Sequence, residues 1–163
     1  MRYVFKPMDY ASAERMIRWR YAPPYGMYNI NAENIDAEIG FFTDPANQYY
    51  ALLTDDGELV AFCCFGDDAR VPGGEYDVDA TDIGMGVRPD LTGKGQGHQY
   101  IELVLDFARK QFDVKMFRAT IAEFNTRALR LCYKAGFEPF DVFQRDNDGK
   151  NFVILVTKEF KEF

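Results

Sequence analysis

Glycines are concentrated in residues 81–98, where an expected strand runs into an expected helix, and this stretch constrains the fold most. The strand alternates, with Ile83, Met85 and Val87 on one face and Gly84 and Gly86 on the other. Glycine inside a strand weakens packing but lets a ligand or another backbone approach closely. Pro89 has no N–H for a sheet hydrogen bond and therefore ends the strand.

Three further glycines, Gly93, Gly95 and Gly97, alternate in the loop that leads into the helix. The helix is indicated by apolar residues on one face: Ile101, Val104, Leu105, Ala108 and Phe112. The first N–H groups of a helix lack intrahelical partners, and the helix dipole adds partial positive charge there. Glycines allow several N–H groups to converge on one anion. The stretch therefore predicts a phosphate site, with Lys94 adding charge and His98 a neutral neighbour or a bystander.

Neither common nucleotide loop fits this stretch. A P-loop needs Ser or Thr after Gly-Lys, whereas the chain reads Gly93-Lys94-Gly95. The dinucleotide pattern needs a third glycine at the position of His98. Two alternatives stay open at this point: a tight strand-to-helix turn without a ligand, and nucleotide binding through the glycine loop.

Two blocks of the sequence resemble the GNAT family of N-acetyltransferases. The first, Val87-x-Pro89 followed by Gly93-Lys94-Gly95-Gln96-Gly97, is similar to the acetyl-CoA loop Arg/Gln-x-x-Gly-x-Gly/Ala, with Thr92 where Arg or Gln is usual. The second, Asn125 to Phe137, is similar to Asn-x-x-Ala-hydrophobic-x-Leu-Tyr-x-x-x-Gly-Phe. Together the blocks cover about residues 81–140.

The resemblance implies acetyl-CoA as co-substrate and a glycine-containing strand that parts from the strand beside it. The pantetheine arm would lie in that opening and pair with the backbone of Met85, Gly86 and Val87. The pyrophosphate would sit on the amides of one continuous run: Gly93, Lys94, Gly95, Gln96, Gly97 and His98. Asn125 would contact CoA, cap the helix that follows, or do both.

The implied reaction is direct attack of a neutral primary amine on the acetyl thioester in a ternary complex. The Val87 N–H is the expected donor to the developing oxyanion. Asp82 matches a position where relatives carry an acidic residue, and it is the candidate general base, acting through water. Its alternative role is a solvent-facing strand carboxylate. Glu123 is a weaker second candidate for the base.

The leaving thiolate needs a proton, which many relatives supply from a tyrosine four residues before the glycine equivalent to Gly136. Cys132 occupies that position, and Tyr133 lies one residue, about 100° of helix, further on. Cys132 is a candidate acid, but it is interpreted first as core filler because it shares a stripe with Ala128 and Leu131. Tyr133 is the other candidate.

Composition narrows the class of protein. With 163 residues, of which 47% are hydrophobic, the chain is expected to form one domain over residues 1–163. The net charge of -7 argues against nucleic acid, and a single histidine argues against a metal site. No apolar run reaches the ~18 residues of a membrane span, and no signal-peptide core is expected near the first residue. Three cysteines without paired spacing predict a reduced, cytoplasmic protein.

The sequence predicts the order β-α-α-β-β-β-α-β-α-β-β, an α/β fold with a central mixed, mainly antiparallel sheet flanked by helices. The expected strands are 2–6, 49–54, 59–65, the glycine strand, 116–122, 137–145 and 151–158. The expected helices run from Asp9 or Ser12 to about Tyr21, over 31–42, over 97–112, and from Asn125 to the cap at Gly136.

Two stretches bear on the acceptor. Four aromatic residues around Pro23-Pro24 form either a lid that contacts an amine or packing between two helices: Trp19, Tyr21, Tyr25 and Tyr28. Six acids from Asp67 to Asp82 form either a solvated loop or a negative rim that attracts a cationic amine.

The expected function is N-acetylation of a small-molecule amine, and a non-catalytic acetyl-CoA sensor is the alternative. The oligomeric state stays open, a homodimer included.

Overall fold

The computed structural model describes residues 2–158. These residues form seven strands, which make up one mixed sheet, and four α-helices. The strands are β1 (Tyr3–Pro7), β2 (Tyr49–Thr54), β3 (Leu59–Phe65), β4 (Thr81–Val87), β5 (Phe117–Ala122), β6 (Glu138–Gln144) and β7 (Asn151–Val156). The helices are α1 (Tyr10–Ile17), α2 (Ile35–Thr43), α3 (Gly97–Gln111) and α4 (Thr126–Lys134). The strand order in the sheet is β1-β2-β3-β4-β5-β7-β6, which confirms the expected fold class.

The chain divides into two compact units. The first contains the residues up to 64 together with residues 85–96, and the second contains residues 65–84 together with the residues from 97 onward. The boundaries fall inside β3 and β4 and at the start of α3, so the glycine-rich stretch contributes to both units.

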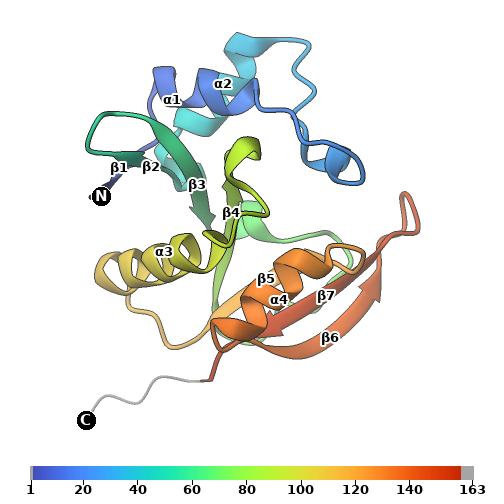
Figure 1. Cartoon of the computed structure of the whole chain (residues 1–163). Helices are drawn as coiled ribbons and strands as arrows, with labels where there is room; N and C mark the ends of the chain where they lie inside the picture. The colour runs from blue at the N-terminus through green and yellow to red at the C-terminus, as the bar shows by residue number, and fades with distance from the viewer. Residues whose placement is uncertain (1, 159–163) are drawn as a thin grey trace. The chain divides into compact units, whose positions relative to one another are not determined.

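In the first unit, β1 and β2 pair antiparallel, and so do β2 and β3. Helices α1 and α2 pack against each other beside these strands (Figure 1). The Asp9 side chain caps α1 by accepting a hydrogen bond from the Ser12 N–H. The apolar stripe Ala13, Met16 and Ile17 is buried, as its helical spacing predicts.

The expected first helix is too long, because α1 ends at Ile17 rather than near Tyr21. The guanidinium of Arg20 turns back and donates to the carbonyl oxygens of Ile17 and Trp19 at 3.0 and 2.7 Å. It therefore satisfies backbone acceptors that a continuing helix would have used. A short 3-10 helix, η1 (Tyr25–Tyr28), follows the prolines.

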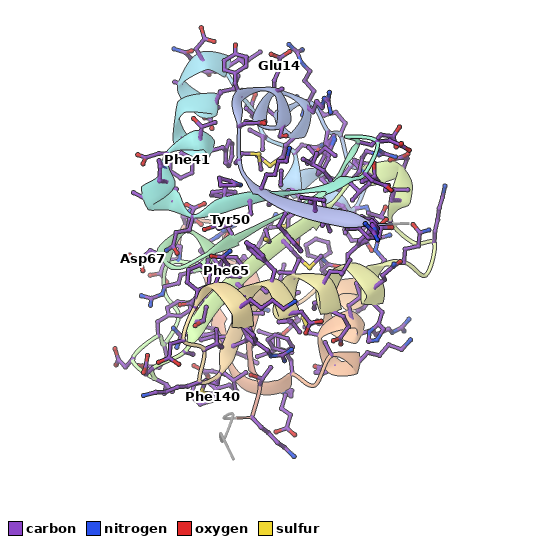
Figure 2. All side chains as sticks on the ribbon, turned by 90° about the vertical axis from the view of Figure 1, so that its left-hand side faces the viewer. Glu14, Phe41, Tyr50, Phe65, Asp67 and Phe140 are labelled. Atoms are coloured by element: carbon purple, nitrogen blue, oxygen red, sulfur yellow. The ribbon has the colours of Figure 1, made fainter. Side chains whose placement is uncertain are left out.

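In the second unit, β5 pairs antiparallel with β7, and β7 with the edge strand β6. Figure 1 shows α4 lying across these strands. The buried face of α3 consists of Tyr100, Ile101, Val104, Leu105 and Ala108. It differs from the predicted stripe by the additional Tyr100 and by Phe112, which follows the end of the helix and is half-buried. Phe65, labelled in Figure 2, contacts the rings of Phe107 and Phe112 with centroids 6.3 and 5.0 Å away.

Helix α4 ends as predicted. Gly136 has a φ of +96°, the left-handed conformation that glycine adopts without strain, and the Phe137 N–H donates to the Cys132 carbonyl oxygen. Among residues 2–158, no helix combines the length and the apolar character needed to cross a membrane.

Candidate functional site

Strand β4 parts from β5 shortly after it begins. The two strands run parallel with Thr81 opposite Phe117 and Asp82 opposite Arg118. Within the described residues this register does not continue to Ile83 and Gly84, although β5 extends to Ala122. The strand pair therefore opens where the family resemblance implied a place for the pantetheine arm.

Gly86 is required by the protein itself. A Cβ at this position would clash with the ring of Phe62 on β3. The expectation that the strand glycines admit a ligand or another backbone is thus incomplete, because an aromatic side chain takes the space at Gly86. The ring of Phe62 also lies 6.2 Å from that of Trp19 and 6.1 Å from that of Tyr49, so β4 rests on an aromatic cluster.

The loop after β4 is ordered by its own side chains. A one-turn 3-10 helix, η4 (Pro89–Leu91), follows Arg88, whose guanidinium binds the Asp90 carboxylate at 2.6 and 3.2 Å. This hydrogen bond lowers the pKa of Asp90. The Thr92 hydroxyl donates to the Pro89 carbonyl oxygen at 2.7 Å. The residue that stands where relatives carry Arg or Gln therefore stabilises a turn.

The glycine loop has the backbone that the phosphate interpretation needs. Gly93 and Gly95 have φ of +73° and +77°, which other residues adopt only with strain. Residues 93–96 are exposed, and a Cβ at Gly95 would meet only open space. An exposed glycine loop that leads directly into a helix N-terminus is suited to binding an anion.

Helix α3 begins at Gly97, which packs closely against α4. A Cβ there would lie 2.7 Å from a methyl group of Leu131 on α4. His98 is exposed, and its Nε2 lies 4.0 Å from the Glu102 carboxylate. The structure thus gives Gly97 a packing role in addition to its predicted place in the loop.

Asp82 is buried, with 3% of its surface exposed, so its alternative role as a solvent-facing carboxylate is wrong. Arg118, itself 1% exposed, donates from Nε and Nη2 to the two carboxylate oxygens at 2.7 and 2.8 Å. Arg70 donates from Nε to Oδ2 at 2.8 Å. A general base needs an oxygen that can accept a proton from substrate or water, so these contacts favour a structural role for Asp82.

A polar network around Tyr76 surrounds this ion cluster, and sequence reasoning missed it. The Tyr76 hydroxyl lies 2.8 Å from the Thr120 hydroxyl and accepts from the Val71 N–H. The guanidinium carbons of Arg118 and Arg70 lie 4.9 and 5.3 Å from the Tyr76 ring centre. The segment 67–80 is therefore anchored at Arg70 and Tyr76 and is more than a solvated loop. An isolated tyrosine among acids gives no sequence signal for such a network.

The two candidate acids on α4 have opposite environments. Cys132 is buried, and burial raises the pKa of its thiol to about 12, which makes it a poor proton donor at neutral pH and favours the core-filler interpretation. Tyr133 is 47% exposed. Asn125 caps α4 as predicted, since its side-chain oxygen accepts from the Ala128 N–H at 3.1 Å.

The aromatic stretch 19–28 reaches β4. The Tyr21 hydroxyl donates to the Val87 carbonyl oxygen at 2.7 Å. The Asn29 side chain brackets the Tyr21 backbone, accepting from its N–H at 2.6 Å and lying 3.4 Å from its carbonyl oxygen. The ring of Tyr28 packs edge-on against that of Tyr21. We call this segment, residues 19–29, the aromatic loop.

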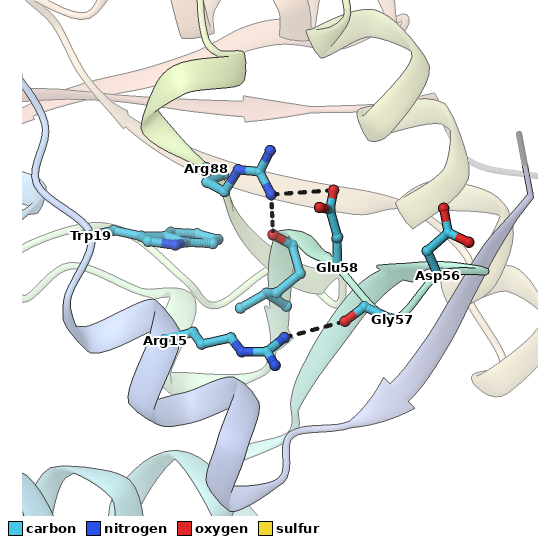
Figure 3. Close-up of a pocket in the computed structure, with 7 residues that line it drawn as sticks. Arg15, Trp19, Asp56, Gly57, Glu58 and Arg88 are labelled. Atoms are coloured by element: carbon cyan, nitrogen blue, oxygen red, sulfur yellow. Dashed lines mark hydrogen bonds and ion pairs between the residues drawn. The ribbon is translucent and has the colours of Figure 1, made fainter.

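A pocket of about 430 Å³ lies in the first unit beside the aromatic loop. Its lining is mainly polar: Arg15, Trp19, Asp56, Gly57, Glu58, Leu59 and Arg88. Figure 3 shows Trp19 between the side chains of Arg15 and Arg88, with Arg15 donating to the Gly57 carbonyl oxygen. Trp19, one of the four aromatic residues of the predicted lid, lines this pocket, whereas none of the predicted acetyl-CoA-binding or catalytic residues does.

Several solved structures with a similar fold are described as acetyltransferases. A structure described as a GNAT-family acetyltransferase from Bordetella pertussis matches with a TM-score of 0.71 at 21% identity, covering 96% of this chain and 95% of that one. A spermidine N-acetyltransferase, the SpeG K23-Q34 chimera from Vibrio cholerae and hSSAT, gives 0.76 at 13% identity, with 97% and 96% covered. AAC(6')-Ib in complex with ribostamycin and coenzyme A gives 0.73 at 16% identity, with 97% and 94% covered.

These likenesses show that the chain has the fold of these acetyltransferase structures. Residues 13–137, well over half of the chain, match the sequence profile of the Acetyltransferase (GNAT) family. The chain belongs to this family. No curated protein sequence matches it.

Proposed function

We propose that the protein transfers the acetyl group of acetyl-CoA to a primary amine of a small molecule, by direct attack within a ternary complex. The observation that carries the proposal is one continuous segment, residues 81–98. In it, a strand that parts from β5 leads into an exposed loop with left-handed glycines and then into a helix N-terminus. This order of features suits a long thioester ligand with a pyrophosphate.

In this proposal the cofactor binds mainly to backbone. Met85, Gly86 and Val87 pair with the pantetheine arm, and the amides of residues 93–98 hold the pyrophosphate. The Arg88 guanidinium is engaged by the Asp90 carboxylate, and Lys94 is the basic residue within the glycine loop that would add charge beside the phosphates. Asn125 keeps its capping role whether or not it also contacts CoA.

The amine nitrogen attacks the thioester carbon, a C–N bond forms, and the C–S bond breaks as the tetrahedral intermediate collapses. The Val87 N–H stabilises the oxyanion of that intermediate. The nitrogen must lose a proton, and CoA must gain one as it leaves. Glu123, which is exposed after β5, is more accessible to a proton than the enclosed Asp82, and we favour it as the base. Tyr133 is exposed whereas Cys132 is buried, and we favour Tyr133 as the acid.

The acceptor we favour is a cationic amine. The chain carries a net charge of -7, and the segment 67–79 contributes five exposed carboxylates: Asp67, Asp68, Glu75, Asp77 and Asp79. The pKa of Glu75 is raised, chiefly by its hydrogen bond to Asp77 and by the charge of that group, as expected where carboxylates crowd together. Such a surface raises the local concentration of polycations. Spermidine and ribostamycin, named with two of the similar structures, are of this chemical class.

A second candidate is a sensor that binds acetyl-CoA without turnover. Two observations favour it: Thr92 stands where Arg or Gln is usual in the loop, and Cys132, at the usual tyrosine position, is buried with a raised pKa. A sensor and an enzyme differ in one measurable property, the release of CoA that depends on an amine.

The test measures CoA release with a thiol-reactive dye across polyamines, aminoglycosides, amino acids and short peptides. Cys63, Cys64 and Cys132 are all buried, so the folded protein will contribute little background colour. Acetyl-CoA binding is measured separately by calorimetry. We expect turnover with one cationic class. Saturable binding without release across the panel would favour the sensor, and no binding of acetyl-CoA would overturn both candidates.

A further inference from the structure

The carbonyl group of Val87 has a partner on a distant part of the chain. Tyr21, which is 66 residues away in sequence, donates its hydroxyl to this oxygen at 2.7 Å. The N–H of the same peptide unit, that of Arg88, donates to the Val60 carbonyl oxygen on β3 at 2.9 Å. The Val87–Arg88 peptide is therefore held at both its polar atoms.

The preceding peptide of the strand, Gly86–Val87, is also restrained. Gly86 lies against the Phe62 ring, and that ring leaves no room for a side chain there. The Val87 N–H belongs to the Gly86–Val87 peptide. On one side of this peptide, Gly86 is fixed by its packing against Phe62. On the other side, the Val87–Arg88 peptide is fixed by its two hydrogen bonds, so the direction of the Val87 N–H is set from both sides. A donor held in this way needs little reorganisation when charge develops on its acceptor.

Tyr21, whose hydroxyl binds Val87, is itself held through its backbone and its ring. Asn29 accepts from the Tyr21 N–H at 2.6 Å, and its amide nitrogen lies 3.4 Å from the Tyr21 carbonyl oxygen. The ring of Tyr28 meets the Tyr21 ring at 77° with centroids 6.5 Å apart. These contacts close the aromatic loop on itself and place it against the end of β4.

We infer that Tyr21 is a positioning residue for acetyl transfer, and this inference rests on the proposed function. Its hydroxyl fixes the strand segment that presents the Val87 N–H to the thioester oxygen. It also attaches the aromatic loop to that same segment. Tyr21 takes up or gives up no proton in the reaction, because its O–H is already donated to a backbone carbonyl.

The sequence offers a direct reporter of this contact. The dipeptide Gly-Val occurs once, at Gly86-Val87, and the dipeptide Val-Arg occurs once, at Val87-Arg88. Protein made with carbonyl-¹³C glycine and ¹⁵N valine therefore gives one cross-peak in an amide-to-carbonyl NMR correlation, that of the Val87 N–H. Carbonyl-¹³C valine with ¹⁵N arginine gives one cross-peak for the Val87 carbonyl and the Arg88 N–H.

The experiment compares wild-type protein with Tyr21→Phe, which removes the hydroxyl alone. We expect both cross-peaks to move, with the Val87 carbonyl carbon shifting upfield as it loses its hydrogen bond. We expect kcat to fall on the order of tenfold, with the Kd for acetyl-CoA nearly unchanged, because misplacing a group by a fraction of an ångström weakens transition-state contacts most. The pH profile of kcat should keep its shape.

A second variant, Asn29→Ala, releases the aromatic loop but keeps the Tyr21 hydroxyl. It should move the same two cross-peaks in the same direction.

Tyr10→Phe is the matched control, because the Tyr10 hydroxyl is exposed and lies 3.5 Å from Asp36, away from β4. It should leave both peaks and kcat unchanged. The inference is overturned if Tyr21→Phe leaves the peaks and kcat unaltered, or if it removes a limb of the pH profile, which would mean that Tyr21 transfers a proton. If wild-type protein binds acetyl-CoA but acetylates no amine, the proposed function fails and the reaction role of Tyr21 fails with it. The cross-peaks would still show whether the hydroxyl holds Val87.

Discussion

Asp82 is an acid at a sequence position that predicts a catalytic role, but its side chain is buried and bound by two guanidinium groups, which favours a structural role. Its neighbours in the sequence suggest an acid on a strand beside a ligand. Its partner Arg118 is 36 residues away, and no local pattern connects the two. The general-base prediction could be made from sequence, whereas burial and the two guanidinium partners could be found only from the fold.

We expect Asp82→Asn to lower the free energy of unfolding by on the order of 3 kcal/mol, because it leaves the charge of buried Arg118 without its counterion. Urea unfolding followed by circular dichroism measures the change. Asp79→Asn is the control, since its 3.8 Å ion pair with Lys115 is exposed and is worth at most about 1 kcal/mol. Unchanged stability with a large loss of kcat in Asp82→Asn would instead establish Asp82 as the base.

At the scale of elements, the bounds of the strands are easier to predict from sequence than the end of the first helix. The spans 49–54 and 59–65 were predicted to the residue, because two apolar runs flank the turn formed by Asp55, Asp56 and Gly57. The first helix was predicted too long, because the periodic stripe continues to Arg20. What ends the helix is a guanidinium bound to backbone carbonyls, an interaction that periodicity does not encode.

The glycine loop is the element whose function can be tested most directly. We expect Gly95→Val to abolish acetyl-CoA binding, measured by calorimetry, because a branched side chain at a φ of +77° strains the loop and covers the amides. Gly57→Val is a matched control. Gly57 has a φ of +84° and, like Gly95, open space around a Cβ, but it lies in the β2–β3 turn. It should destabilise the protein comparably and leave the affinity for acetyl-CoA intact. Equal loss of affinity in both variants would refute a specific role of the loop.

At the scale of the whole molecule, the buried thiols connect stability to alkaline pH. Burial raises the pKa of Cys132 from 9.0 to about 12, and burial also raises the pKa of Cys63. In the unfolded chain these thiols ionise near their ordinary value, whereas in the fold they stay protonated. Each thiol therefore favours folding fully below pH 9, and its contribution is lost as the pH rises from 9 toward the folded pKa.

We expect the free energy of unfolding to fall with a slope of up to about 1.4 kcal/mol per pH unit for each buried thiol above pH 9. Cys132→Ala should make that slope shallower, because it removes the contribution of the Cys132 thiol to the pH dependence of the free energy of unfolding. Urea unfolding at pH 8, 9 and 10 measures both slopes, and other titrating groups cancel because the two proteins share them. Identical slopes would show that Cys132 ionises as readily in the fold as in the unfolded chain.

The division of the chain into two interleaved units also has a consequence for synthesis. The first unit takes residues up to 64 and then residues 85–96, while residues 65–84 belong to the second. A ribosome delivering the chain from its N-terminus therefore cannot release a finished first unit once Cys64 has emerged. That unit stays incomplete until Gln96 has left the exit tunnel, which is when the strand carrying Val87 and the loop carrying Gly95 become available. The nascent chain up to Cys64 must therefore wait for the segment that carries the glycine loop before the first unit can close.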